Sequence, residues 1–289
     1  MKRMILAGVL VMAVGASGLM AKKDKKNKDQ EQPAQAQSQP AGPHPKSKAE
    51  LEAVQALISA QGNPDATIAA AENLVTKFAD TDYKDTALFM EAQAYRQKGD
   101  RDKAVIYGER TLATNPKNYQ ASLMLAELTV QGTRETDLDK ADKLAKADKY
   151  ANDSITAINE ATKPNPQITD EQWGDLKKDM IAQAHDALGM SALNRKDYNA
   201  AIDQFKQAID GAAHVEPAYE VRLASAYYQA GKNDEAVTLA DKVMAEAQTP
   251  QQIKSVAQAV RAGAIQAKNK AGKGSNASAP PQVQINKQP

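Results

Sequence analysis

The chain has 289 residues, of which 42% are hydrophobic and only 4% aromatic, and it contains no cysteine. Its 37 basic and 36 acidic side chains are interspersed and give a net charge of +1, which argues against a broad nucleic-acid-binding face. The lack of cysteine excludes disulfides and a lipid-modified cysteine. No stretch shows sustained period-two alternation, so we expect an all-helical protein without a sheet.

The N-terminus, residues 1–21, has the layout of a secretory signal peptide. Lys2 and Arg3 precede an uncharged apolar run, residues 4–20, which ends among small residues. We therefore expect cleavage and a periplasmic or secreted protein. Five lysines follow the run directly, and in an uncleaved chain they would favour a cytoplasmic C-terminal side. A membrane anchor formed by residues 4–20 is therefore the alternative, and only then would the chain contact a membrane.

Two further segments have compositions that cannot bury enough apolar surface to fold. Residues 22–46 are rich in Lys, Gln and Pro, and residues 269–289 are rich in Gly, Ser, Asn, Pro and Gln. We predict a disordered linker and a disordered tail on either side of a helical domain, residues 47–268. Ser47 and Glu50 have the spacing of a capping box that opens the first helix of this domain.

One short pattern recurs along the helical domain. A turn, often with glycine, is followed by a polar cap, a helical first turn and a small residue; it occurs at residues 62–67, 99–104, 136–141, 196–201 and 231–236. Glycine suits the left-handed residue just past a helix, and Asn or Asp caps the next helix. A fixed period of this size is typical of stacked helical hairpins.

The middle of the chain departs from the period. A helix that starts near Leu138 shows no stop before residues 163–166, Lys-Pro-Asn-Pro, and the next helix, opened by a capping box at residues 169–172, runs to about Asn194. These helices, each of about 24 residues, predict an elongated antiparallel hairpin. We expect Trp173 to pin the two helices together near the tip, and an exposed aromatic anchor for a partner is the alternative.

The recurring unit resembles the tetratricopeptide repeat. Residues 85–118 carry the family's large and small positions as Leu88, Ala92, Tyr95, Ala104 and Pro116. Residues 182–215 and 217–250 carry similar sets, and residues 48–81 match more weakly. The resemblance implies an all-α solenoid of about five repeats, followed by a capping helix that opens at Thr249 and Pro250. It also implies a non-catalytic scaffold or adaptor for protein partners.

In that family the first helix of each repeat lines a concave groove. Carried over, this implies a partner-binding set that mixes apolar, amide and charged side chains and that suits an extended or helical partner segment. The set is Phe89, Gln93, Arg96, Leu123, Glu127, Met190, Leu193, Val221, Ser225 and Tyr228. The alternative is that neighbouring repeats or self-association bury some of these residues.

Motifs of catalysis are scarce. No two histidines have the i, i+4 spacing of a helical metal site, and no nucleotide-binding loop is present. His185 beside Asp186 resembles half of a catalytic triad, but consecutive helix residues point in different directions. We therefore expect a protein-binding scaffold of the cell envelope that is not an enzyme and has no cofactor or metal. The alternatives are a self-associating structural solenoid, or an enzyme with an unrecognised site in the long hairpin.

Overall fold

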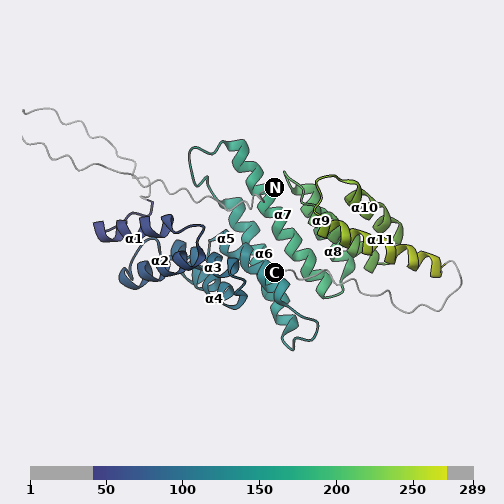
Figure 1. Cartoon of the computed structure of the whole chain (residues 1–289), viewed down its shortest axis with the longest axis horizontal. Coiled ribbons are helices and arrows are strands. Elements are labelled where there is room, and N and C mark those ends of the chain that lie inside the picture. Colours follow the sequence, from purple (N-terminus) through teal and green to yellow (C-terminus); the bar gives the residue numbers. More distant parts are fainter. Residues whose placement is uncertain (1–41, 272–289) are drawn as a thin grey trace, which may run out of the picture.

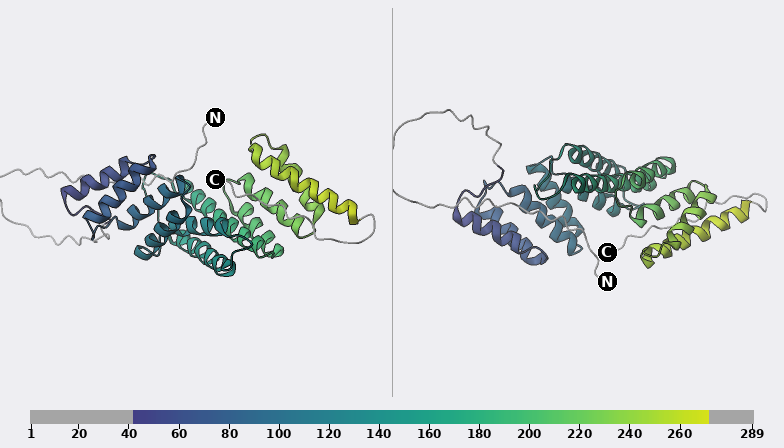
Figure 2. Two further views of the ribbon diagram at one scale, coloured as in Figure 1. Left: turned by 60° about the horizontal axis from the view of Figure 1, so that its bottom comes forward. Right: turned by 90° about the horizontal axis from the view of Figure 1, so that it is seen from above.

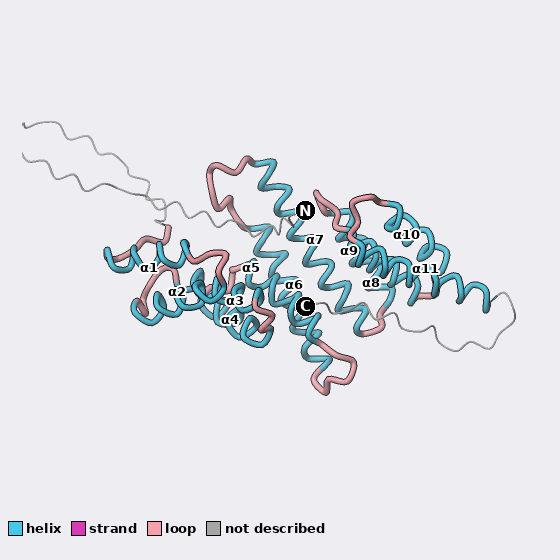
Figure 3. Tube along the Cα trace, in the orientation of Figure 1, coloured by secondary structure: helices cyan, strands magenta, loops and turns pink. Residues whose placement is uncertain are grey.

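The computed structural model describes residues 42–271, and within this range the chain forms eleven helices and no strand (Figure 1 and Figure 3). The helices are α1 Lys48–Ser59, α2 Pro64–Lys77, α3 Lys84–Gln97, α4 Arg101–Thr114, α5 Tyr119–Gly132, α6 Lys140–Glu160, α7 Asp170–Asn194, α8 Tyr198–Gly211, α9 Pro217–Gln229, α10 Asn233–Ala245 and α11 Gln251–Ala271. Each helix packs on the next. The repeat pairs them into five hairpins, α1–α2, α3–α4, α5–α6, α7–α8 and α9–α10, which are followed by α11. The long helices α6 and α7, from the third and fourth hairpins, also pack on each other and form the elongated central hairpin. This confirms the predicted all-α solenoid with an elongated central hairpin.

The turns within the hairpins have the predicted chemistry. Gly62, Gly99 and Gly231 have positive φ angles of 91°, 76° and 76°. In the fourth hairpin the same left-handed position is occupied by Lys196, with φ 64°. Side chains of Asn63, Asp100 and Asp197 accept a hydrogen bond from the first turn of the following helix, as expected for N-caps, and so does Asn118 at the start of α5.

The third unit is the exception to this chemistry. Its second helix, α6, begins at Lys140 and not near Leu138, because the Asp137 carboxylate accepts hydrogen bonds from the Arg134 amide and from Lys143 and so holds the preceding loop. Asp137 therefore does not cap a helix. Ala141, the small residue that ends the recurring pattern in this unit, is exposed. At the corresponding position Ala104, Ala201 and Ala236 are fully buried.

The central hairpin, α6 and α7, has helices of 21 and 25 residues, against 12 to 14 for α1–α5 and α8–α10. At 1.5 Å per residue, α6 and α7 are about 32 and 38 Å long. The predicted Thr169–Gln172 capping box forms at the start of α7. Figure 2 shows that the helices before and after this hairpin bend to the same side of it, so the molecule is an elongated arch.

The N-terminal edge of the fold differs from the prediction. The expected signal peptide, residues 1–21, and most of the expected linker lie outside the described residues, but residues 43–46 contact the loop before α3. Tyr83 donates a hydrogen bond to the carbonyl of Pro43 at 2.9 Å, and Lys46 forms ion pairs with Asp80 and Asp82. The linker expected over residues 22–46 therefore ends earlier, because these two aspartates and the tyrosine hydroxyl provide partners for it.

The final helix, α11, covers the end of the solenoid. Its buried residues Ala257, Val260 and Ala264 pack on α9 and α10. Gln251, Gln258 and Gln266 on the same helix are exposed to solvent. A polar outer face is what a terminal repeat needs for solubility. The helix runs to Ala271, and the rest of the expected tail lies outside the described residues. Within the described part, no helix combines the length and the apolar character that crossing a bilayer requires.

Candidate functional site

The first helices of the hairpins, which carry the predicted partner-binding set, are the more buried helices. α3, α5 and α9 bury eight residues each, spread around the helix, whereas α2, α4, α8 and α10 bury three or four. The reason is that each of these first helices lies between the second helix of its own hairpin and that of the preceding hairpin. Only part of their surface is therefore left for a partner.

Half of the predicted set proves to be core. The buried members are Phe89, Leu123, Val221, Ser225 and Tyr228, each at most 7% exposed. Phe89 packs with residues of α5, and Tyr228 lies beneath α11 in a cluster with Val260 and Ala264. These five residues are therefore not available in an open groove, and the alternative of burial by neighbouring repeats describes them correctly.

The other half of the set stays accessible. Arg96 is exposed, and Gln93, Glu127, Met190 and Leu193 are half-buried. The Arg96 Nη2 donates a hydrogen bond to the Glu127 Oε2 at 2.7 Å, and this ion pair joins α3 to α5. Met190 and Leu193 lie on α7, against the cluster of Ala192, Ile202, Phe205 and Leu223. The accessible surface is thus polar on α3 and α5, with partly covered apolar side chains on α7.

A second ion pair, between Asp186 and Arg222, joins α7 to α9. We call Arg96, Glu127, Asp186 and Arg222 the charge track, because the four residues come from four successive first helices. Burial raises the pKa of the Glu127 and Asp186 carboxyls, and the paired guanidinium opposes the rise in each case. Asp186 is 6% exposed, and its Oδ1 has no hydrogen-bond partner within the described part of the protein.

Sequence reasoning did not predict the second pair of the track. Asp186 drew attention only as a neighbour of His185. The usable signal was the spacing: Arg96 and Glu127 are 31 residues apart, and Asp186 and Arg222 are 36 apart, both close to one repeat. Opposite charges on first helices one repeat apart can meet when consecutive repeats stack.

Trp173 is buried, which agrees with the structural role that the sequence favoured. Its side chain is 9% exposed near the tip of the α6–α7 hairpin, and the Lys177 ammonium lies 5.4 Å from the ring centre. Lys177 also donates a hydrogen bond to the Asn159 carbonyl of α6, which ties the two helices together. The buried ring does not offer an exposed anchor for a partner.

The histidines do not assemble a catalytic group. His185 Nδ1 lies 2.9 Å from Gln204 Oε1, whereas its neighbour Asp186 pairs with Arg222, so the two side chains have different partners. The His214 imidazole contacts the Asp179 carboxylate, with 2.8 Å between Nδ1 and Oδ2. This contact raises the pKa of the exposed imidazole. No group of His, Asp or Glu in residues 42–271 has the arrangement of a metal site.

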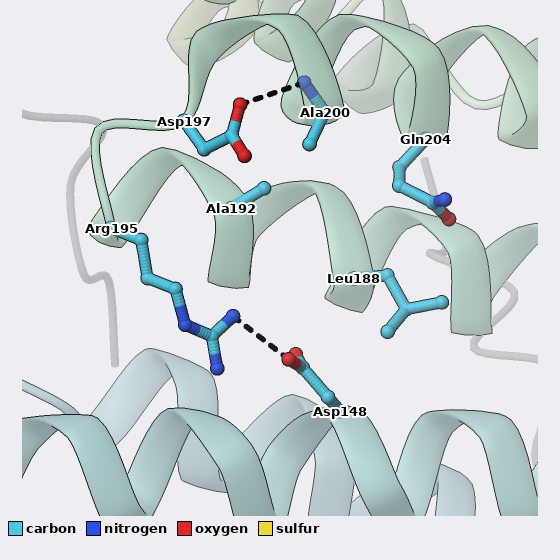
Figure 4. A pocket seen from close by; sticks show the side chains of 7 residues that line it. All are labelled: Asp148, Leu188, Ala192, Arg195, Asp197, Ala200 and Gln204. Atoms are coloured by element: carbon cyan, nitrogen blue, oxygen red, sulfur yellow. Dashed lines mark hydrogen bonds and ion pairs between the residues drawn. The ribbon is translucent and has the colours of Figure 1, made fainter.

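A shallow pocket of about 190 Å³ lies between α6, α7 and α8 (Figure 4). Leu188, Ala192 and Ala200 form its apolar wall. The Arg195 guanidinium points across it to Asp148, with 2.8 Å between Nη1 and Oδ2, and also bonds the Ser191 hydroxyl. This volume is below the usual range for a small-molecule site, roughly 300–1,000 Å³. The pocket therefore has room for about one side chain.

Two segments of the chain match models of the tetratricopeptide repeat, at residues 85–118 and 218–254. They correspond to the α3–α4 hairpin and to the α9–α10 hairpin with the start of α11. Stacked helical hairpins of this kind define the α-solenoid class of protein. Within that class, the two matched segments identify tetratricopeptide repeats in this chain, and proteins with such repeats are typically scaffolds for protein interactions.

Several solved structures resemble the chain at low sequence identity. A thermophilic tetratricopeptide repeat protein of Thermus thermophilus is 19% identical, with a TM-score of 0.49 over 73% of this chain and 98% of that one. An assembly chaperone of the protein RpL4 is 12% identical, with a TM-score of 0.43 over 78% and 99%. A tetratricopeptide repeat protein of Parabacteroides merdae is 15% identical, with a TM-score of 0.42 over 78% and 93%. No curated protein matches the chain.

Proposed function

We propose that the chain is an exported, non-catalytic scaffold of the cell envelope that holds a segment of a partner protein on the surface of its first helices. The observation that carries this proposal is the accessible set Gln93, Arg96 and Glu127 on two successive repeats. Amide, guanidinium and carboxylate groups can hydrogen-bond the backbone of an extended segment, and Met190 and Leu193 add partly exposed apolar contact farther along the chain.

Export is the second part of the proposal, and it rests on residues 1–21. The basic start, the apolar run and the small residues at its end favour cleavage. The mature chain is expected to begin near residue 19 or 22, which mass spectrometry of periplasmic and membrane fractions would measure. A full-length chain in the membrane fraction would replace export with anchoring by residues 4–20.

Site-specific photo-crosslinking in the producing cell tests the binding surface. A crosslinking amino acid at Gln93 is expected to capture a partner protein, and the same amino acid at exposed Lys149 on α6 serves as the matched control. Combining the probe at Gln93 with Arg96→Ala should reduce the yield of the adduct. An adduct with twice the mass of the chain would instead indicate self-association, and equal adducts from Gln93 and Lys149 would contradict binding at the first helices.

A further inference from the structure

The two ion pairs of the charge track cross the solenoid at places where helices otherwise scarcely touch. The backbones of α3 and α5 hardly come close to each other, and those of α7 and α9 come close at only a few residues. By contrast, α5 and α7 pack together. Arg96–Glu127 and Asp186–Arg222 therefore bridge the two joints that the helix packing leaves loose on this side of the arch.

The two bridges differ in their exposure to solvent. In Arg96–Glu127 the side chains are 47% and 18% exposed, whereas in Asp186–Arg222 they are 21% for the arginine and 8% for the aspartate. Salt screens charges that face water and screens buried pairs much less. Ionic strength therefore acts on the joint between α3 and α5 and largely spares the joint between α7 and α9.

The second and third hairpins are also connected on the opposite side of the solenoid, through α4 and α6. There α4 and the loop that follows it are tied to α6: Lys146 pairs with Glu109 at 2.5 Å, Tyr150 donates to Glu109 at 3.1 Å, and Lys117 pairs with Glu160 at 3.0 Å. The two ion pairs are more exposed than Arg96–Glu127, at 51% and 38% and at 81% and 58%, so salt screens them as well. The apolar packing of α4 on α5 persists, and when Arg96–Glu127 is released the first two hairpins can rotate about it.

We propose that the Arg96–Glu127 ion pair is an electrostatic latch that holds the first two hairpins at a fixed angle to the rest of the arch and that releases at high ionic strength. The molecule then consists of two bodies, residues 48–114 and residues 119–271, joined at α4–α5. The curvature of the arch, and with it the spacing of groups on the first helices, depends on the salt concentration. This inference does not depend on the proposed partner.

A distance measurement between two labels tests the latch, and the absence of native cysteine makes the labelling unambiguous. The first pair of labels, at Gln55→Cys on α1 and Gln258→Cys on α11, spans the joint, and both positions are exposed. The second pair, at Ala145→Cys on α6 and Gln258→Cys, lies within the larger body. Spin-label or fluorescence distance distributions are recorded at about 0.01 M and about 1 M salt, where the Debye length falls from about 30 Å to about 3 Å.

We expect salt to shift the Gln55–Gln258 distribution and to leave the Ala145–Gln258 distribution unchanged. Arg96→Gln and Glu127→Gln should produce the shifted distribution already at low salt and should reduce the salt response. Lys149→Gln, which breaks an ion pair within α6 only, is the matched control and should behave as the parent. Because Arg96 is half exposed, Arg96→Gln is expected to fold, and its circular dichroism melting curve checks this.

Two outcomes would overturn the proposal. One is a Gln55–Gln258 distribution that stays the same at both salt concentrations and in both latch variants, which would mean that packing at α4–α5 alone fixes the angle. The other is a salt-induced shift of equal size in both label pairs, which would mean that the whole solenoid loosens and that the joint has no special role.

Discussion

At the scale of single residues, close contacts between neighbouring helices depend on glycines inside those helices. A Cβ atom on Gly189 of α7 would lie 2.5 Å from Cε1 of Phe205, a ring that is fully buried. Gly174 of the same helix has open space where its Cβ atom would be. The two positions share a helix and a residue type, and they differ only in what surrounds them.

The first prediction compares alanine at these two glycines. Gly189→Ala should destabilise the protein by about 1–3 kcal/mol, because the overpacked Phe205 ring has to move. Gly174→Ala should stabilise it by up to about 1 kcal/mol, because alanine is the better helix former. Urea unfolding of both variants measures the difference, and stabilisation by Gly189→Ala would show that α7 and α8 do not approach as closely as described.

Glu91 is a buried carboxyl, and neighbouring groups offset only part of the cost of burying its charge. It is 1% exposed on α3, and burial raises its pKa from 4.5 to about 7, with a smaller contribution in the same direction from Glu72, whereas the Tyr107 hydroxyl and Arg110 oppose the rise. Between pH 4.5 and 7 the folded state thus binds a proton that the unfolded state has released. The stability contributed by this proton is present below pH 4.5 and is lost as the pH rises to about 7.

The second prediction follows from this sign. Glu91→Gln should be more stable than the parent at pH 8, by about 1–3 kcal/mol, and close to the parent at pH 4.5. Urea midpoints at both pH values measure the effect, with exposed Glu52→Gln on α1 as the control variant. Parallel pH profiles for the parent and Glu91→Gln would show that the carboxyl titrates normally.

Local chemistry was the part of the fold that the sequence predicted well. The turn glycines, the caps at Asn63, Asp100 and Asp197 and the capping box at Thr169 each depend on residues within four positions of one another. The exposure of Phe89 or Tyr228, in contrast, depends on how closely the next hairpin or α11 approaches. A repeat pattern gives the phase of a side chain on its helix, but the angle between hairpins decides whether solvent reaches it.

At the scale of elements, one aromatic side chain is buried near the tip of the α6–α7 hairpin, and we expect it to hold the two helices together. Trp173→Ala should lower the protection of amides in the C-terminal half of α6 and the N-terminal half of α7 against hydrogen exchange, because it removes the packing of a buried ring. Amides of α1–α4 and α9–α11 should keep their protection. Lys177→Gln, which keeps the ring and removes the ammonium above it, separates packing from the cation–π contact.

Hydrogen exchange that speeds up uniformly across all helices, or that stays unchanged at the tip, would contradict this role of Trp173. The sequence predicted the elements of the central hairpin well. The Pro-bracketed loop and the apolar pattern indicated two long helices, and the structure differs in the start of α6. The bonds of Asp137 to Arg134 and Lys143, which hold that loop, have no signature in helix periodicity.

At the scale of the whole molecule, α11 determines where the stacking ends. Val260 is fully buried against α9 and α10, so Val260→Glu should place a charge in an apolar contact and displace the helix. The uncovered surface around Tyr228 should then promote self-association, which light scattering measures. Gln258→Glu puts the same charge on the exposed face of α11 and is expected to remain like the parent.

A Val260→Glu variant that stays monodisperse at the concentration of the parent would show that α11 is dispensable as a cover.

The architecture of the whole arch was only partly predictable. The number of hairpins followed from the repeat, but the charge track did not, because it depends on side chains that meet 31 and 36 residues apart across two joints.

The projecting tip of the central hairpin has a consequence for how this chain can change in length. A residue added within one of the regular hairpins would alter its contacts with both neighbours. Residues 161–169 join α6 and α7 at an end of the hairpin that stands apart from the other hairpins in Figure 1. Insertions in this loop leave the register on either side intact, so we expect it to accept a whole foreign domain.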